Sequence, residues 1–148
     1  MRIIFKKFLL LLTLLTVSLT VWAVDPVYND SGLAIGGYDA VAYFTEQRPV
    51  WGNSKHTHEW QGVKWQFDSE QNKNLFIANS EKYTPQYGGY CAYAAAKGTI
   101  VPSDPNSWSI VNNKLYLNYS PAIQQRWNSN VNGYTSRADA KWPKLIKQ

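Results

Sequence analysis

The only cysteine of this 148-residue chain, Cys91, lies in the run YTPQYGGYCAYAAAKG at residues 83–98. Residues 91–97 are rich in alanine, a strong helix former, and Gly98 is typical of a helix end. This pattern predicts a short helix with Cys91 in its first turn. The positive end of the helix dipole favours a thiolate there, which is the form that binds soft metal ions and attacks electrophiles.

The residues before Cys91 predict a loop that leaves the thiol with little steric cover. Pro85 and the pair Gly88 and Gly89 interrupt a helix, and glycine permits backbone angles and close approaches that other residues resist. Three tyrosines surround the cysteine, namely Tyr87, Tyr90 and Tyr93. They could line a pocket, or they could pack in the core with a polar tip. The last two are three positions apart and would share a helix face.

Both histidines of the chain, His56 and His58, are candidate metal ligands. They are two positions apart, so on a strand they lie on the same side and can approach one ion together. His58 is the better candidate because it leads directly into the next strand-forming segment. The simpler interpretation of this short pattern is two solvated histidines at a strand edge. Asp39 could supply an oxygen ligand or position a ligand, or it could cap a short helix.

The first 23 residues have the pattern of an export signal. Three basic residues precede an apolar run at residues 8–21, and Ala23 ends a segment typical of a signal-peptidase site. At roughly 14 residues the apolar run is short for a bilayer span of about 20. We expect cleavage after Ala23, a mature chain of residues 24–148 without a stable membrane span, and a periplasmic or secreted location.

Removal of this segment lowers the net charge. The full chain has 15 Lys and Arg against 10 Asp and Glu, and loss of the three basic residues leaves 12 against 10, or +2. So small a charge gives no reason to expect nucleic-acid binding. The sequence also has no glycine-rich phosphate loop with its lysine and no nucleophilic serine elbow, which argues against nucleotide and hydrolytic chemistry.

The hydrophobic patterns predict a small single α+β domain with two antiparallel β-hairpins and several short helices. The first hairpin is expected at residues 56–67, where Val63, Trp65 and Phe67 alternate with polar residues. The second is expected at residues 108–119 around a turn at 112–114.

Capping residues mark where the helices should begin. Ser69 or its neighbour should start a helix through about residue 79, and Ser120 followed by Pro121 should start another. A final helix is expected around residues 136–141, ending before Pro143. The lead-in at residues 25–32 is predicted to be a loop.

Four segments resemble exported bacterial YHS-domain proteins in order and spacing: GYDAVAYF at 37–44, GVKWQF at 62–67, YTPQYGGYCAY at 83–93 and KLYLNY at 114–119. The resemblance covers nearly all of the mature chain. It implies a YHS-type domain at residues 24–148, related to small metal-binding folds of the treble-clef type. It also implies a link with metal handling, because the wider group includes domains of heavy-metal-transporting ATPases. In the exported branch selenocysteine sometimes replaces the cysteine, which implies redox or soft-metal chemistry at Cys91.

The chain departs from the metal-associated YHS pattern at two positions. Such domains carry cysteines after the opening Asp-Pro-Val and behind the second hairpin strand, where this chain has Tyr28 and the residues after Phe67. A closed four-sulfur zinc site is therefore ruled out, because one cysteine cannot supply four thiolates.

Three functions fit these observations. The first is binding of copper(I) or zinc by Cys91 with His58 or His56, since thiolate and imidazole suit these ions. The second is a thiol-dependent oxidoreductase in which Cys91 becomes a sulfenic acid or mixed disulfide that another molecule resolves. The third is a non-catalytic module whose aromatic pocket, with Tyr87, Tyr90 and Tyr93, accepts a ligand or partner while Cys91 is merely packed. Of the three, the sequence favours metal binding, with thiol redox chemistry second.

Overall fold

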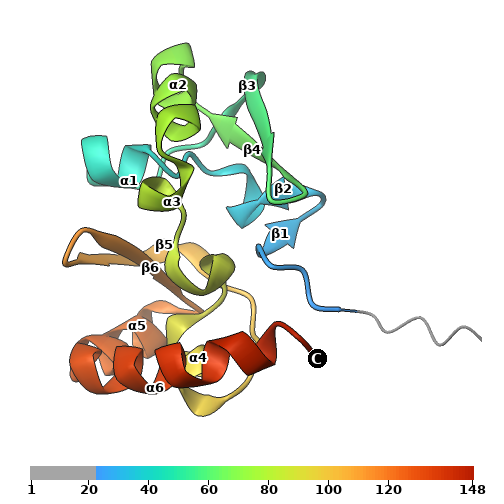
Figure 1. Ribbon diagram of the computed structural model, residues 1–148. Coiled ribbons are helices and arrows are strands. Elements are labelled where there is room, and N and C mark those ends of the chain that lie inside the picture. The colour runs from blue at the N-terminus through green and yellow to red at the C-terminus, as the bar shows by residue number, and fades with distance from the viewer. Residues whose placement is uncertain (1–22) are drawn as a thin grey trace, which may run out of the picture.

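The computed structural model describes residues 23–148, and they form a mixed α+β domain with two sheets and six α-helices (Figure 1). The predicted fold class is confirmed. The proposed export signal falls almost entirely on residues 1–22, which lie outside the described residues. The strands are β1 (Asn29–Asp30), β2 (Leu33–Ala34), β3 (Asn53–Trp60), β4 (Val63–Phe67), β5 (Asp104–Val111) and β6 (Lys114–Asn118). The α-helices are α1 (Ala42–Thr45), α2 (Glu70–Ala78), α3 (Ser80–Tyr83), α4 (Ala92–Lys97), α5 (Pro121–Asn128) and α6 (Val131–Leu145). Two 3-10 turns, η1 (Ile35–Gly37) and η2 (Gln86–Gly89), complete the elements.

Both predicted hairpins are present. In the first, β3 and β4 meet at Gln61 and Gly62, whose φ angles of 54° and 74° belong to the left-handed region that tight hairpin turns require. In the second, β5 and β6 meet at Asn112 and Asn113, which have φ of 52° and 60°. Asparagine tolerates this region better than most residues, which explains why the turn forms there.

Helices α2 and α5 are capped by the serines that the sequence predicts. The Ser69 side chain accepts a hydrogen bond from the backbone N–H of Asn72 at the start of α2. Ser120 accepts one from the N–H of Ile123 at the start of α5, with Pro121 in the first turn. These bonds satisfy N–H groups that have no partner inside the helix, so the predicted starts are confirmed.

The predictions for the two ends of the domain were wrong. Within the lead-in at residues 25–32, Asn29 and Asp30 form the short strand β1, which pairs with β2 directly after the lead-in. Strand β2 in turn pairs in parallel with β4, which gives the order β1-β2-β4-β3. The last helix, α6, begins at Val131 instead of near 136, because the Asn130 side chain caps it by accepting from the N–H of Gly133. It also continues past Pro143, and the burial of Leu145 offsets the one backbone hydrogen bond that proline removes.

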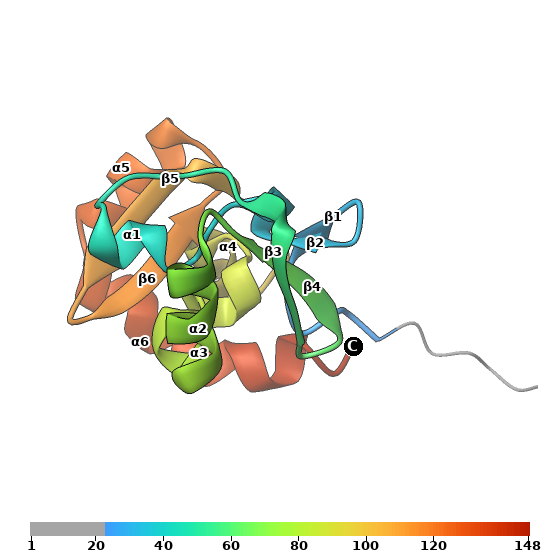
Figure 2. The same cartoon turned by 90° about the horizontal axis from the view of Figure 1, so that it is seen from above.

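Strand β6 lies between two hydrophobic cores. Leu115 and Leu117 belong to the core under the four-stranded sheet, which includes Trp65, Phe67 and Phe76. Tyr116, between them, belongs to the core formed with helices α4, α5 and α6. Alternate residues of a strand point to opposite faces, so β6 contributes to both cores. The β5–β6 hairpin accordingly lies between the sheet and the helices in Figure 1, and beside the sheet when seen from above in Figure 2.

Candidate functional site

Cys91 lies immediately before α4, at the capping position and not in the first helical turn. Its backbone N–H donates to the carbonyl oxygen of Val101 at 3.0 Å, and it forms a parallel bridge with Leu117 of β6. The helix ends at Gly98, whose φ of +87° is the left-handed conformation expected of a glycine cap. The predicted short helix is therefore present, and the cysteine is fixed between β6 and the loop after the helix.

The thiol is buried, contrary to the expected open loop. Cys91 is 1% exposed, and its Sγ lies 3.7 Å from Oδ1 of Asn118, to which the thiol donates. Burial raises the pKa of the Cys91 thiol, because removal from water disfavours the charged form. Backbone N–H groups of Ala94, Tyr119 and Tyr93 act in the opposite direction on this pKa but do not outweigh burial. The expectation of a favoured thiolate was wrong for this reason.

Asn118 is the residue of this site that sequence reasoning missed. It is fully buried at the end of β6, and its Oδ1 also accepts from the backbone N–H of Tyr93 at 3.0 Å. Its Nδ2 has no hydrogen-bond partner within residues 23–148. The only sequence signal was an asparagine that ends the apolar run Leu115–Leu117 of a strand. Asn118 thus joins β6 to the first turn of α4 beside the thiol.

A cavity of about 240 Å³ opens over the cysteine, and apolar atoms line it. Its lining comes from α4, the loop that follows and the start of α5: Cys91, Tyr93, Ala94, Lys97, Thr99, Val101, Tyr119 and Ile123. Tyr93, one of the tyrosines that the sequence suggests for a pocket, is among these lining residues. The Lys97 ammonium lies over the Tyr93 ring at 5.3 Å from its centroid. An apolar group is the kind of occupant that such a lining favours.

Neither histidine lines this cavity. His56 contacts Glu70 of α2, with 3.1 Å between Nδ1 and Oε2, and this hydrogen bond helps to hold the pKa of the Glu70 carboxyl below its usual range. The His58 ring faces Phe76 of the same helix edge-on. Both side chains therefore point to the α2 side of β3, as their spacing predicts. Within residues 23–148, no group of three His, Cys, Asp or Glu side chains could hold a metal ion.

Asp39 is a structural cap, and it does not line the cavity. One carboxylate oxygen accepts from the N–H groups of Val41 and Ala42 at 2.9 and 3.2 Å. The other accepts from the N–H of Asp68 at 2.9 Å and from Nδ2 of Asn72 at 2.7 Å. The side chain is fully buried, and these four donors occupy the lone pairs that a metal would use. The capping role is confirmed.

The two glycines before the cysteine allow close backbone approaches, as predicted. A Cβ on Gly88 would lie 2.0 Å from the carbonyl oxygen of Pro26, and one on Gly89 would lie 2.7 Å from Cγ2 of Ile35. Tyr87 has a left-handed φ of 56° and is buried. Its hydroxyl donates to Oδ1 of Asp139 in α6 at 2.9 Å, and burial together with this bond raises the pKa of Tyr87.

Tyr90 and Tyr93 do not share a helix face. Tyr90 precedes the cap in an extended conformation, so helical spacing does not apply to it. Its ring packs on Tyr28 and Trp142, and its hydroxyl donates to the carbonyl oxygen of Asp25 at 3.1 Å. The Tyr93 ring packs on Tyr134. The rings of Tyr87 and Tyr90 both pack on Trp142, and among the three tyrosines only Tyr93 lines the Cys91 cavity.

Comparison of the chain with profiles of known protein families, with curated proteins and with solved structures found no match. Across residues 23–148, no helix has both the length and the apolar character needed to cross a membrane. The resemblance to YHS domains stays a prediction, and a functional conclusion has to rest on the geometry of the site.

Proposed function

We propose that the protein is an exported YHS-type binding protein that holds a small apolar ligand in the cavity over Cys91, without catalysing a reaction on it. The observation that carries this proposal is the lining of the cavity, where apolar atoms surround a buried thiol. The raised pKa of Cys91 supports it, because a neutral thiol behaves as a small hydrophobic group.

An NMR titration with indole as an apolar probe tests this proposal. We expect saturable shifts in the amide signals of α4 and of Ile123. Ala94→Leu should abolish them, because the larger side chain fills the cavity that Ala94 lines. Ala140→Leu is the matched control, since Ala140 is exposed on α6 and lines no part of this cavity. Equal binding of indole to both variants would refute the proposed site.

Thiol redox chemistry is a second candidate, supported by the amides around the sulfur. The backbone N–H groups of Tyr93, Ala94 and Tyr119 would stabilise a thiolate once it formed. A peroxide could then oxidise it: the sulfur attacks one oxygen, sulfenic acid forms and water leaves, and an external thiol reduces the product. Trapping with dimedone after addition of hydrogen peroxide tests this. Labelling of Cys91 faster than that of a free cysteine would favour the redox function.

Copper(I) or zinc binding at Cys91 also stays a prediction, although His56 and His58 lie outside the cavity. An anaerobic copper(I) titration with a competing chelator, on the protein and its Cys91→Ser variant, separates it from the proposed function. Tight one-to-one binding of copper(I) that the variant loses would show that the site binds a metal ion instead of an apolar ligand. Equal weak binding to both proteins would eliminate copper.

A further inference from the structure

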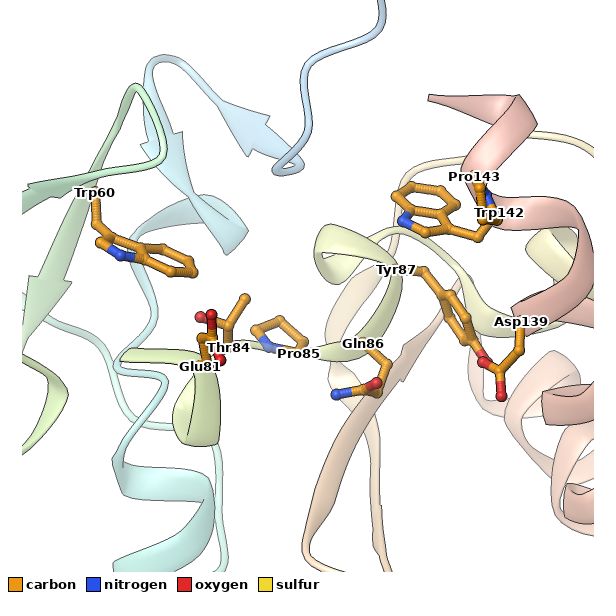
Figure 3. A pocket seen from close by; sticks show the side chains of 9 residues that line it. All are labelled: Trp60, Glu81, Thr84, Pro85, Gln86, Tyr87, Asp139, Trp142 and Pro143. Atoms are coloured by element: carbon orange, nitrogen blue, oxygen red, sulfur yellow. The ribbon is translucent and has the colours of Figure 1, made fainter. Parts of the chain in front are cut away.

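The hollow between strand β3 and helix α6, about 320 Å³ in volume, has an acidic lining (Figure 3). Glu81 and Asp139 line it, and no Lys, Arg or His does. Trp60 and Trp142 lie at its opposite ends, so a single small ligand does not contact both indole rings. An anion is repelled by such a lining. This hollow therefore serves as a reference for the Cys91 cavity, whose lining differs in charge.

Lys97 is the one charged residue in the lining of the Cys91 cavity. Because apolar atoms form this lining, Lys97 contributes its alkyl stem to the wall. Its ammonium lies over the Tyr93 ring, and the side chain is exposed. Among residues 23–148, it forms no ion pair with a carboxylate. The cavity thus has a positive charge beside it that no carboxylate of the described chain neutralises.

Two more cations, from α6, lie close to the residues around Lys97. The Arg137 guanidinium lies over the Tyr134 ring at 4.8 Å from its centroid, and that ring packs on Tyr93 at 5.1 Å between centroids. Lys141 donates from Nζ, at 3.0 Å, to the backbone carbonyl that precedes Lys97. Neither cation forms an ion pair in the part of the chain that the structure describes. Their charges add to a positive potential that attracts anions, while Lys97 alone lines the cavity.

We infer that the ligand of the Cys91 cavity is a small organic monoanion of the carboxylate class, whose apolar body fills the cavity and whose charge pairs with Lys97. This inference rests on the proposed function and names the class of its ligand. One ammonium beside the cavity matches one negative charge. The volume of about 240 Å³ lies below the range for drug-sized ligands, about 300–1,000 Å³, so a single ring system or a short chain fits.

NMR titrations with three indole derivatives test this inference. Indole-3-acetate is the anion, indole-3-acetamide is its uncharged isostere, and tryptamine is a cation with the same rings. At low ionic strength, we expect indole-3-acetate to shift the amide signals of α4 and of Ile123 saturably. It should bind about fivefold more tightly than the amide, and tryptamine should bind most weakly. The indole N–H signals of Trp60 and Trp142 should not follow the same binding curve, because those rings line the acidic hollow.

The possible outcomes separate this inference from the proposed function. Equal affinities for indole-3-acetate and its amide would overturn the inference and leave the apolar binding site in place. If indole itself does not bind, the inference and the proposed function both fail. A common binding curve for α4 and for the two tryptophans would show binding without a preferred site and would also overturn the inference.

A pair of lysine variants locates the contact with the anionic group. Lys97→Gln removes the ammonium and keeps most of the alkyl stem, so the preference for indole-3-acetate over the amide should fall from about fivefold to less than about twofold. Lys82→Gln is the matched control, because Lys82 is also exposed, also lies over a tyrosine ring, and lines no part of the cavity. It should keep the full preference. Equal losses in both variants would mean that net charge and not Lys97 sets the preference, and would overturn the inference.

Discussion

At the scale of single residues, two opposing effects act on Cys91. Its position before α4 places backbone N–H groups near the sulfur, which favours the thiolate. Its burial at 1% exposure removes water, which favours the neutral thiol. Burial is the larger effect, so the pKa rises and the thiol remains protonated near neutral pH. This protects an unpaired cysteine in the oxidising location that we expect for the protein.

The raised pKa of Cys91 predicts a pH dependence of stability. Because the folded-state pKa lies above the unfolded value of about 8.5, the stabilisation is complete below that pH. It is lost as pH rises through the folded-state pKa, with a slope of at most about 1.4 kcal/mol per pH unit. Urea unfolding between pH 7 and 10 should show this extra loss in the wild-type protein and not in Cys91→Ser. If the free energy of unfolding falls by the same amount with pH in both proteins, the prediction is contradicted.

Substitution of the buried carboxylate of Asp39 should also destabilise the protein. In Asp39→Asn, an amide NH₂ that cannot accept hydrogen bonds replaces one of the two carboxylate oxygens. In one orientation it faces the N–H of Asp68 and Nδ2 of Asn72. In the other orientation it faces the N–H groups of Val41 and Ala42. Some buried donors then lose their acceptor, and the free energy of unfolding should fall by about 2–4 kcal/mol. Urea denaturation measures the loss. Asp68→Asn makes the same charge change at an exposed side chain and should cost less than about 0.5 kcal/mol.

At the scale of elements, the turn η2 and helix α4 are held by contacts with distant segments. Gly88 packs on the backbone of Pro26, and its carbonyl accepts from the N–H of Tyr28 at 2.8 Å. Lys141 of α6 donates from Nζ to the carbonyl oxygen of Ala96 at 3.0 Å, near the end of α4. A cation there also interacts favourably with the helix dipole. The six-residue helix is therefore stabilised mainly by tertiary contacts, as expected for so short a segment.

Alanine substitutions at Gly88 and Gly36 separate two contributions to stability, that of the close backbone approach and that of the left-handed backbone conformation. Both have a left-handed φ, +61° and +66°, but a Cβ on Gly36 would meet no atom within 4 Å. Gly36→Ala should therefore cost about 1–2 kcal/mol for the conformation alone. Gly88→Ala also clashes with a backbone carbonyl and should cost several kcal/mol more or prevent folding. Thermal unfolding by circular dichroism measures both, and equal losses would show that the clash is relieved.

At the scale of the whole molecule, β6 joins the two hydrophobic cores. Its leucines pack under the four-stranded sheet and Tyr116 packs on Trp127 at 4.7 Å between ring centroids. The strand is buried on both faces, although its hairpin has only two strands. A two-stranded hairpin is at best marginally stable alone, so each core depends on the other to hold β6 in place.

This arrangement predicts one cooperative unfolding transition. Leu117→Ala should destabilise the protein by about 2–5 kcal/mol, since Leu117 is fully buried. The loss should appear equally in far-UV circular dichroism and in tryptophan fluorescence, which report different parts of the structure. Two separate transitions, with only one moved by the substitution, would show that the cores unfold independently.

The local features of this protein can be predicted from its amino-acid sequence alone. The hairpin turns, the caps at Ser69 and Ser120, the helix after Cys91 and the capping role of Asp39 follow from preferences of a few adjacent residues. The burial of Cys91, its contact with Asn118 and the separation of the histidines from the thiol arise instead from the packing of distant segments. These depend on segments distant in the chain, and spacing along a strand does not specify what packs against it. The C-terminal end of α6 was decided in the same way, because burial of Leu145 outweighs the proline that predicts an earlier end.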